Sequence, residues 1–180
     1  MITGHLATTL VAKREAPTMP WWLLAVAAML IDIAMFTLVA LGVEQMVPNP
    51  EASGPRLATT IVEMTYSHDL IPQAFWIGAS GALAYLVTRN RQFTLIAMIL
   101  TGAHWLGDLV AGYGHFVFGP ESRALGTDWY HLNLPAALGF EAALGVACVY
   151  WFTRGRSFSL GVQAALYGVF GVLPFAFLII

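Results

Sequence analysis

Long apolar stretches separated by short polar segments run through the whole chain, and they predict membrane-spanning helices. A helix needs roughly 20 mostly apolar residues to cross the hydrocarbon core of a bilayer. Such stretches occupy residues 21–43, 70–87, 93–117, 132–152 and 158–180. They do not alternate as barrel strands do, and only helices or closed barrels satisfy their backbone groups in lipid. We therefore expect an all-α integral membrane protein, in which a bundle of about five transmembrane helices forms one domain over residues 1–180.

The segment before the first span is apolar but too short to cross a bilayer. It runs from Ile2 to Ala12 and is followed by the basic pair Lys13 and Arg14. A helix of that length either lies in the membrane interface or enters the bilayer without crossing it. The pattern therefore predicts a short N-terminal helix, interfacial or re-entrant, ahead of the bundle.

Composition excludes a soluble protein of the usual kind. Hydrophobic residues make up 58% of the chain and charged residues only 10%, whereas about a quarter of a typical soluble domain is charged. The net charge of −2 argues against a nucleic-acid partner, so the expected partners are membrane lipids. The single cysteine, Cys148, lies in an apolar run, excludes an internal disulfide and is expected to pack between helices.

Basic residues divide unequally between the two sides of the predicted bundle. With five spans, one side carries six of them: Lys13, Arg14, Arg89, Arg91, Arg154 and Arg156. The other side carries only Arg56 and Arg123. Because cytoplasmic loops are enriched in Lys and Arg, we expect a protein of the bacterial cytoplasmic (inner) membrane. Its N-terminus is expected in the cytoplasm and its C-terminus on the extracytoplasmic side.

Four ionisable residues lie well inside the predicted spans, away from their ends, where each costs about 2.5–3.5 kcal/mol on insertion scales. They are Asp32, His104, Asp108 and Glu141. His104 and Asp108 are four residues apart and therefore share one helix face. A histidine and a carboxylate in that arrangement either bind one cation or hydrogen-bond to each other. Glu141 is a candidate acceptor for a ligating histidine, or a general base.

The directions of the predicted spans bring some of these side chains to similar depths. Asp32 and His104 are expected near the middle of the membrane, with Asp108 one turn further outward. His68 and Asp69 stand at the outer mouth of the second span. Histidines and carboxylates together suit a divalent metal such as zinc, and the alternative is a buried polar network that only fixes helix packing. Four other polar residues are expected to be solvated at the outer surface: Glu63, His115, Asp128 and His131.

Several short motifs, in this order and spacing, resemble a family of small bacterial multi-pass proteins known as membrane-bound metal-dependent hydrolases. They are Gly4-His5, Leu30-Ile31-Asp32-Ile33, Tyr66-Ser67-His68, His104-Trp105-Leu106-Gly107-Asp108, and the run from Leu125 through Asn133-Leu134-Pro135 to Glu141. The resemblance covers about Ile2 to Phe152. It implies that the metal ligands are His5, Asp32, His68, His104 and Asp108. One departure is Asp69, where the family usually has serine. His5 joins the others only if the N-terminal segment dips into the bilayer.

The resemblance implies a metal-dependent hydrolase that acts on an ester or phosphoester in the lipid phase. A bound zinc ion would lower the pKa of its water to about 7 and polarise the bond to be cleaved. Asp69 or Glu141 would then accept the proton of that water.

Two other classes of function also fit the sequence. The chain is alternatively a non-catalytic transmembrane subunit of a larger complex, including one that binds pigments, since it has little outside the membrane and 13% aromatic residues. In that case partner membrane subunits are expected. The third class is a proton or ion pathway through Asp32, His104 and Asp108. No inverted repeat or pair of broken helices is visible to support a pathway.

Overall fold

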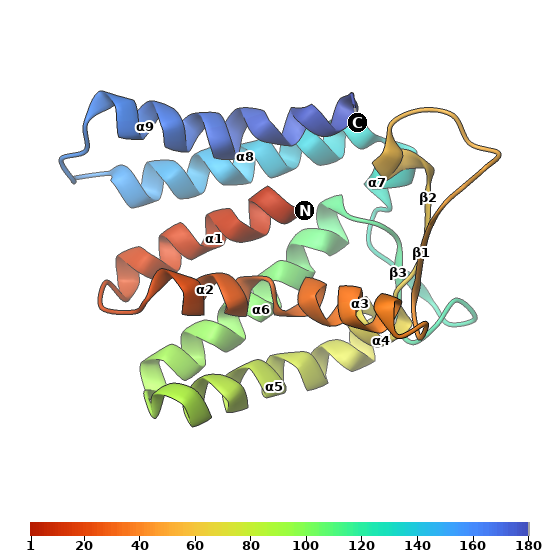
Figure 1. The fold of residues 1–180 in the computed structure, drawn as a ribbon, viewed down its shortest axis with the longest axis horizontal. Helices are drawn as coiled ribbons and strands as arrows, with labels where there is room; N and C mark the ends of the chain where they lie inside the picture. Colours follow the sequence, from red (N-terminus) through yellow and green to blue (C-terminus); the bar gives the residue numbers. More distant parts are fainter. Residues whose placement is uncertain (180) are drawn as a thin grey trace.

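The computed structural model describes residues 1–179 as a bundle of helices with two short β-hairpins at one end (Figure 1). The α-helices are α1 (Ile2–Glu15), α2 (Trp21–Ala28), α3 (Leu30–Ala40), α4 (Thr65–His68), α5 (Leu70–Thr88), α6 (Arg91–Ala111), α7 (Trp129–Leu132), α8 (Leu134–Thr153) and α9 (Leu160–Tyr167). Strands β1 (Gln45–Pro48) and β2 (Thr60–Glu63) pair antiparallel, as do β3 (His115–Phe116) and β4 (Ala124–Leu125). The 3₁₀ turn η1 (Arg56–Thr59) precedes β2.

Four continuous helical segments are long and apolar enough to cross a membrane. They are α5, α6, α8 and the segment Leu160–Leu178. The last begins as α9 and continues as the π-helical turn η2 (Gly168–Val172) and the 3₁₀ turn η3 (Leu173–Leu178). A fifth crossing is present if α2 and α3 together form one span. These helices confirm the predicted fold class of an all-α membrane bundle.

The first predicted span is not one straight helix. α2 and α3 meet at Met29 with a bend of 60°, and α3 ends at Ala40. A break frees backbone carbonyls, and in lipid these need partners from neighbouring helices. Two residues of α6 lie beside these carbonyls. The Thr101 hydroxyl is within hydrogen-bond distance of the Ala27 carbonyl, at 3.1 Å, and of the Ala97 carbonyl of its own helix, at 3.0 Å. His104 Nδ1 lies 2.6 Å from the Ala28 carbonyl. The expectation of a continuous helix over residues 21–43 is therefore wrong.

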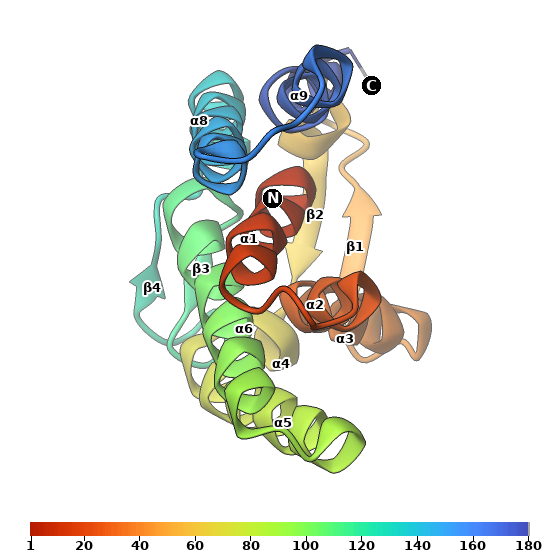
Figure 2. The same ribbon diagram turned by 90° about the vertical axis from the view of Figure 1, so that its left-hand side faces the viewer.

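The N-terminal helix α1 lies inside the bundle, not on its surface. It packs against α2, α6 and α8, and Figure 2 shows it near the centre of the molecule. Buried residues occur along its length, from Thr3 to Ala12. Its 14 residues span about 21 Å, less than the roughly 30 Å of a bilayer core. Of the two predicted alternatives, the structure therefore has the re-entrant one.

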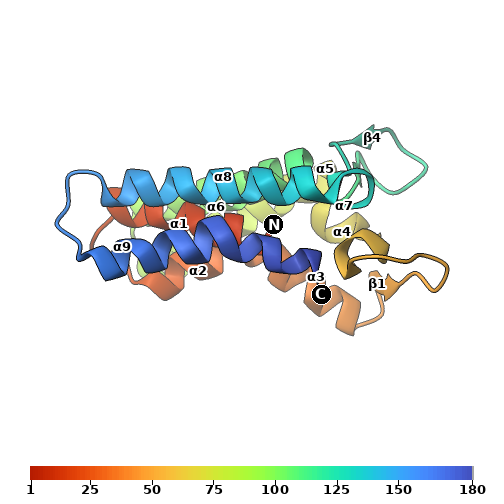
Figure 3. The same cartoon turned by 90° about the horizontal axis from the view of Figure 1, so that it is seen from above.

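Close packing around α1 depends on a glycine of α6. A Cβ atom on Gly107 would lie 2.5 Å from Met1 Cε and 3.6 Å from His5 Cε1. The missing side chain thus leaves room for the first turn of α1 beside α6. The other side of α1 contacts α8, and Figure 3 shows α8 and α9 side by side.

Helix ends elsewhere differ from the sequence expectation by a few residues. The third predicted span extends to residue 117, but α6 ends at Ala111, and His115–Phe116 form strand β3. This difference matters because it moves His115 out of a helix and into a strand beside the cluster of ionisable residues described below. The remaining long helices begin and end within two residues of the predicted spans.

The six basic residues predicted on one side do lie at one end of the bundle. This end holds the α1–α2, α5–α6 and α8–α9 connections, and the β-hairpins lie at the other (Figure 1). Arg14 donates to the Trp151 and Arg154 carbonyls, and Gln92 donates to the Glu15 carbonyl. Met1 does not lie in a loop at this end, because α1 carries it into the bundle, where it is 6% exposed.

Candidate metal centre

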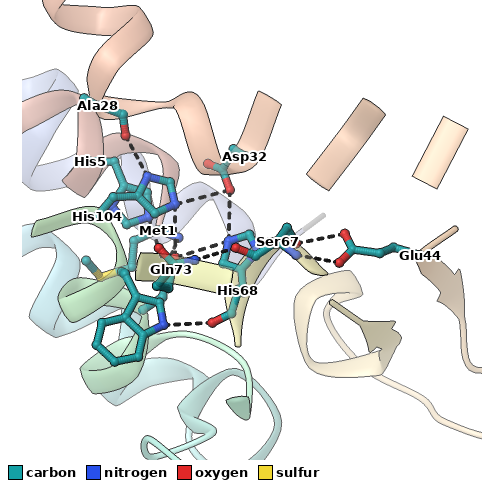
Figure 4. A network of polar contacts seen from close by, with 11 residues as sticks. Met1, His5, Ala28, Asp32, Glu44, Ser67, His68, Gln73 and His104 are labelled. Atoms are coloured by element: carbon teal, nitrogen blue, oxygen red, sulfur yellow. Dashed lines mark hydrogen bonds and ion pairs between the residues drawn. The ribbon is translucent and has the colours of Figure 1, made fainter. Parts of the chain in front are cut away.

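Four helices bring ionisable side chains to one buried point. Asp32 comes from the first turn of α3, His68 from the end of α4, and His104 and Asp108 from α6. His5 comes from α1. All five side chains are buried, and Figure 4 shows how His5, Asp32, His68 and His104 converge. The structure therefore brings together every residue that the resemblance implied as a ligand.

Two histidine nitrogens face the same two carboxylate oxygens. His104 Nε2 lies 3.2 Å from Asp108 Oδ2 and 3.5 Å from Asp32 Oδ1. His68 Nε2 lies 3.6 Å from each of the same oxygens. Four ligands at zinc distances of about 2.0–2.1 Å in a tetrahedron would be separated by about 3.3 Å. The four nitrogen–oxygen distances are thus close to that separation.

The other nitrogen of His104 fixes its tautomer. His104 Nδ1 lies 2.6 Å from the carbonyl oxygen of Ala28, which can only accept a hydrogen bond. Nδ1 therefore carries a proton, and Nε2 faces the carboxylates. Both Nε2 and Asp32 Oδ2 are buried without a hydrogen-bond partner in residues 1–179. A nitrogen in this position can bind a metal ion, or it can carry a second proton and form an ion pair with the carboxylates.

A second chain of hydrogen bonds orients His68 in the same way. Ser67 Oγ donates to Glu44 Oε2 at 2.8 Å, so the serine oxygen accepts from His68 Nδ1, also at 2.8 Å. Glu44 also accepts from the backbone N–H groups of Tyr66 and Ser67. His68 Nε2 is therefore left to face Asp32 and Asp108. Such partners on the far nitrogen are the usual support of a metal-bound histidine.

Backbone contacts fix the position of His68 as well as its tautomer. Trp105 Nε1 donates to the His68 carbonyl at 2.8 Å, and Gln73 donates to the Ser67 carbonyl. Trp105 follows His104 directly on α6. The helix that carries two of the candidate ligands therefore also holds the short helix that carries a third.

The re-entrant helix holds Asp108 from the opposite side. His5 Nε2 lies 3.1 Å from Asp108 Oδ1, and the Met1 amino group donates to the same oxygen at 3.2 Å. The His5 ring stacks on His104 with centroids 3.5 Å apart. These contacts turn the other oxygen, Oδ2, toward His68 and His104.

Among residues 1–179, two sets of three potential ligands stand out. Within each set, the ligand atoms all lie within 4.8 Å of one another. One set is His68, His104 and Asp108, and the other is His5, Asp32 and His104. Both contain His104, which has only Nε2 available. We therefore interpret the two sets as one site for a single ion, with two carboxylates to balance a divalent charge. Histidine and carboxylate donors fit zinc and related metals.

Asp69 does not take the place expected of a general base. Its two oxygens accept hydrogen bonds from the backbone N–H groups of Phe116 at 2.8 Å and Gly119 at 2.6 Å. Burial raises the pKa of the Asp69 carboxyl above its ordinary value, and the two amide groups oppose that shift. The extra acid beside His68 thus anchors the β3–β4 hairpin to the start of α5.

Glu141 contacts the first turn of α1. Its Oε1 accepts from Thr3 Oγ1 at 2.7 Å and from the Gly4 N–H at 2.9 Å. The Gly4 N–H is one of the backbone donors left without a partner at a helix N-terminus, which a carboxylate stabilises. Glu141 also lines the cavity that contains Asp32, His68 and Asp108. It therefore supports α1 and stands in the same cavity wall as three candidate ligands.

A cavity of about 90 Å³ lies beside the cluster. The polar part of its wall includes Asp32, His68, Asp108, His115 and Glu141. Most of the remaining lining residues are apolar. The candidate ligands Asp32, His68 and Asp108 thus border a cavity with a mostly apolar wall.

Sequence reasoning placed His115 among solvated residues, and this was wrong. His115 is 1% exposed, lies in β3 and stacks parallel to His68 with ring centroids 5.6 Å apart. Burial lowers the pKa of His115 to about 4, so the ring is neutral near pH 7. Of the other three outer residues, Asp128 and His131 pair at 2.8 Å, with both side chains about one-third exposed, and Glu63 is exposed.

Glu44 and Ser67 were also missed as members of the site. Ser67 stands inside the motif Tyr66-Ser67-His68, so its adjacency to a candidate ligand was a usable signal. Glu44 is 22 residues from Tyr66 and follows an apolar run, and no spacing in the sequence connects the two.

No family model, curated protein or solved structure matched the chain when it was compared with known proteins.

Proposed function

We propose that this chain is a membrane-embedded metal-dependent hydrolase that acts on an ester or phosphoester taken from the lipid phase. The observation that supports it is the pair of oriented histidines. His68 and His104 each have Nδ1 committed to an acceptor and Nε2 directed at Asp32 and Asp108. With Nδ1 occupied, each Nε2 is available as a metal ligand. The motif resemblance to metal-dependent hydrolases favours the same function.

Zinc is the metal that we propose for the site. His68, His104, Asp32 and Asp108 would hold it, with His5 orienting Asp108. Zinc supplies a Lewis acid and a water with a pKa near 7. Glu141 lines the same cavity and would accept the proton of that water, whereas the Asp69 oxygens are engaged by backbone amides.

Elemental analysis of the purified protein tests the metal. We expect about one equivalent of zinc or a related divalent metal in the wild type, and its loss in His104→Ala and Asp108→Ala. His131→Ala is the matched control. His131 lies in α7, at the same end of the bundle as the β-hairpins, but it pairs with Asp128 and does not line the cavity. This variant should keep the metal.

A folded wild-type protein that holds no divalent metal, even after incubation with zinc, would end the proposal. The cluster would then be a packing network. The two other hypotheses, a non-catalytic subunit and a proton pathway, would remain. If metal is present, the reaction itself is tested with lipid esters and phosphoesters. The acid or alcohol that they release is measured with and without a chelator.

We further propose that the protein lies in a bacterial cytoplasmic membrane, with the end rich in Lys and Arg in the cytoplasm. Six of the eight basic residues lie at that end. The β-hairpins and the mouth beside them then face the extracytoplasmic side. On this orientation the metal centre receives its substrate from the outer half of the bilayer.

A further inference from the structure

His115 is a buried histidine with no partner. It is 1% exposed, and neither of its ring nitrogens has a hydrogen-bond partner within residues 1–179. Buried polar groups in proteins are nearly always paired, so an unpaired one calls for an explanation. The imidazole ring of His115 lies parallel to that of His68, with ring centroids 5.6 Å apart.

This histidine does not belong to the metal centre itself. Its nitrogens are in neither set of ligand atoms. It nevertheless lines the same cavity as Asp32, His68 and Asp108. A neutral imidazole offers one N–H donor and one acceptor. His115 is therefore placed to contact a molecule in the cavity while that molecule reaches the ion.

Apart from two tyrosines, Tyr113 and Tyr130, the rest of the cavity wall is formed by apolar side chains. Met35 and Phe36 of α3, Met46 of β1, Leu57 of η1 and Phe177 of η3 line it. The cavity thus has one polar end, at the metal centre and His115, and an apolar remainder that continues toward the β1–β2 hairpin. Such a wall matches a molecule that has a polar head and a hydrocarbon chain.

We propose that the cavity binds an amphiphile, with a hydrocarbon chain along Met46, Leu57 and Phe177 and an oxygen atom of its head group hydrogen-bonded by His115. This proposal rests on the proposed function, because the same head group would reach the metal. It adds the substrate class and assigns His115 as the residue that binds the head group from outside the metal shell. It also explains why the imidazole is left without a partner from the protein.

The test separates the head-group contact from the chain contact. The protein is placed in phosphatidylcholine nanodiscs, loaded with zinc, and titrated calorimetrically with methylphosphonate and with decylphosphonate. Both probes carry the same anionic head, and neither contains a bond that hydrolysis would cleave. Metal content is measured on the same samples, so that a failure of metal binding is recognised separately.

His115→Ala should bind both probes about 10- to 100-fold more weakly than the wild type, as expected for a lost hydrogen bond to a charged group. His115→Gln keeps an amide donor and should recover most of this loss. His131→Ala should bind both probes as the wild type does. Metal content should stay at the wild-type level in all three variants.

Met46→Trp fills the apolar part of the cavity and should weaken decylphosphonate by about tenfold or more while leaving methylphosphonate unchanged. Partition into the lipid is the same for both proteins, so this difference isolates the cavity. Unchanged binding of both probes in metal-loaded His115→Ala would overturn the role of His115. Unchanged decylphosphonate binding in Met46→Trp would overturn the amphiphile. A wild type without metal would instead defeat the proposed function.

Discussion

Ser67 shows how much at this site depends on a single hydroxyl group. It accepts from His68 and donates to Glu44, so one proton fixes the tautomer of a candidate ligand. The serine makes no contact with the ion position itself. Its effect on metal binding is therefore exerted through the orientation of the imidazole ring.

Replacement of Ser67 by alanine should weaken zinc binding by about 10- to 100-fold, the usual cost of removing the partner of a metal-bound histidine. Competition with a fluorescent zinc chelator in detergent measures this directly. Ser80→Ala is the control, because the Ser80 hydroxyl bonds only to the Ile77 carbonyl of its own helix. Equal zinc affinity in both variants would show that the Glu44–Ser67–His68 chain does not support a metal.

At the same scale, the sequence predicted the ligands better than their surroundings. His104 and Asp108 could be paired because a separation of four residues puts both on one helix face. The contacts of Asp69 and the burial of His115 were not predicted, because both depend on how the β3–β4 hairpin folds back over the start of α5. No spacing in the sequence reports that fold. Hydrogen bonds to backbone amides, as at Asp69, leave no signal in the side-chain pattern.

At the scale of elements, the apolar runs predicted the spans but not the break between α2 and α3. Length and hydropathy are properties of the run itself, whereas the break is held by Thr101 and His104 of another helix. The re-entrant path of α1 was one of two open alternatives for a similar reason. Its place is decided by Gly107 and Glu141, which come from α6 and α8.

Thr101→Val should destabilise the bundle by about 1–2 kcal/mol, because the Ala27 carbonyl at the helix break loses a buried hydrogen-bond donor. Valine has nearly the same shape as threonine, so packing changes little. Unfolding in sodium dodecyl sulfate measures the difference. Thr94→Val is the control, since Thr94 bonds only to the Asn90 carbonyl of its own helix. A loss of the same size at both positions would argue against a special role of the break.

Substitutions of Glu141 can distinguish its structural role, the support of α1, from its proposed role as a general base. Glu141→Gln retains a carbonyl oxygen for Thr3 and Gly4 and should keep both the stability and the metal. It removes the carboxylate that would act as a base, so lipid hydrolysis should fall by about 100-fold or more. Glu141→Ala should in addition lower the free energy of unfolding by about 1–3 kcal/mol, because the α1 donors are left unpaired. Full hydrolysis by Glu141→Gln would assign the residue to structure alone.

At the scale of the whole molecule, one end of the bundle carries most of the positive charge and the other carries the hairpins and the cavity mouth. The candidate ligands on α6 lie near its C-terminal end, at His104 and Asp108, rather than at the basic end where α6 begins. Catalysis from the outer leaflet therefore requires the basic end to face the cytoplasm. A reversed protein would present the same centre to the cytoplasmic side.

Cysteine labelling decides between these orientations. Cys148 is buried and is the only cysteine, so Cys148→Ala gives a background free of thiols. Ala52→Cys then places one thiol in the exposed β1–η1 loop, and Ser157→Cys places one in the exposed α8–α9 connection. In intact cells a membrane-impermeant maleimide should label Ala52→Cys at once and Ser157→Cys only after the membrane is opened. The reverse order would put the hairpins and the cavity mouth in the cytoplasm, and the substrate would then have to come from the inner leaflet.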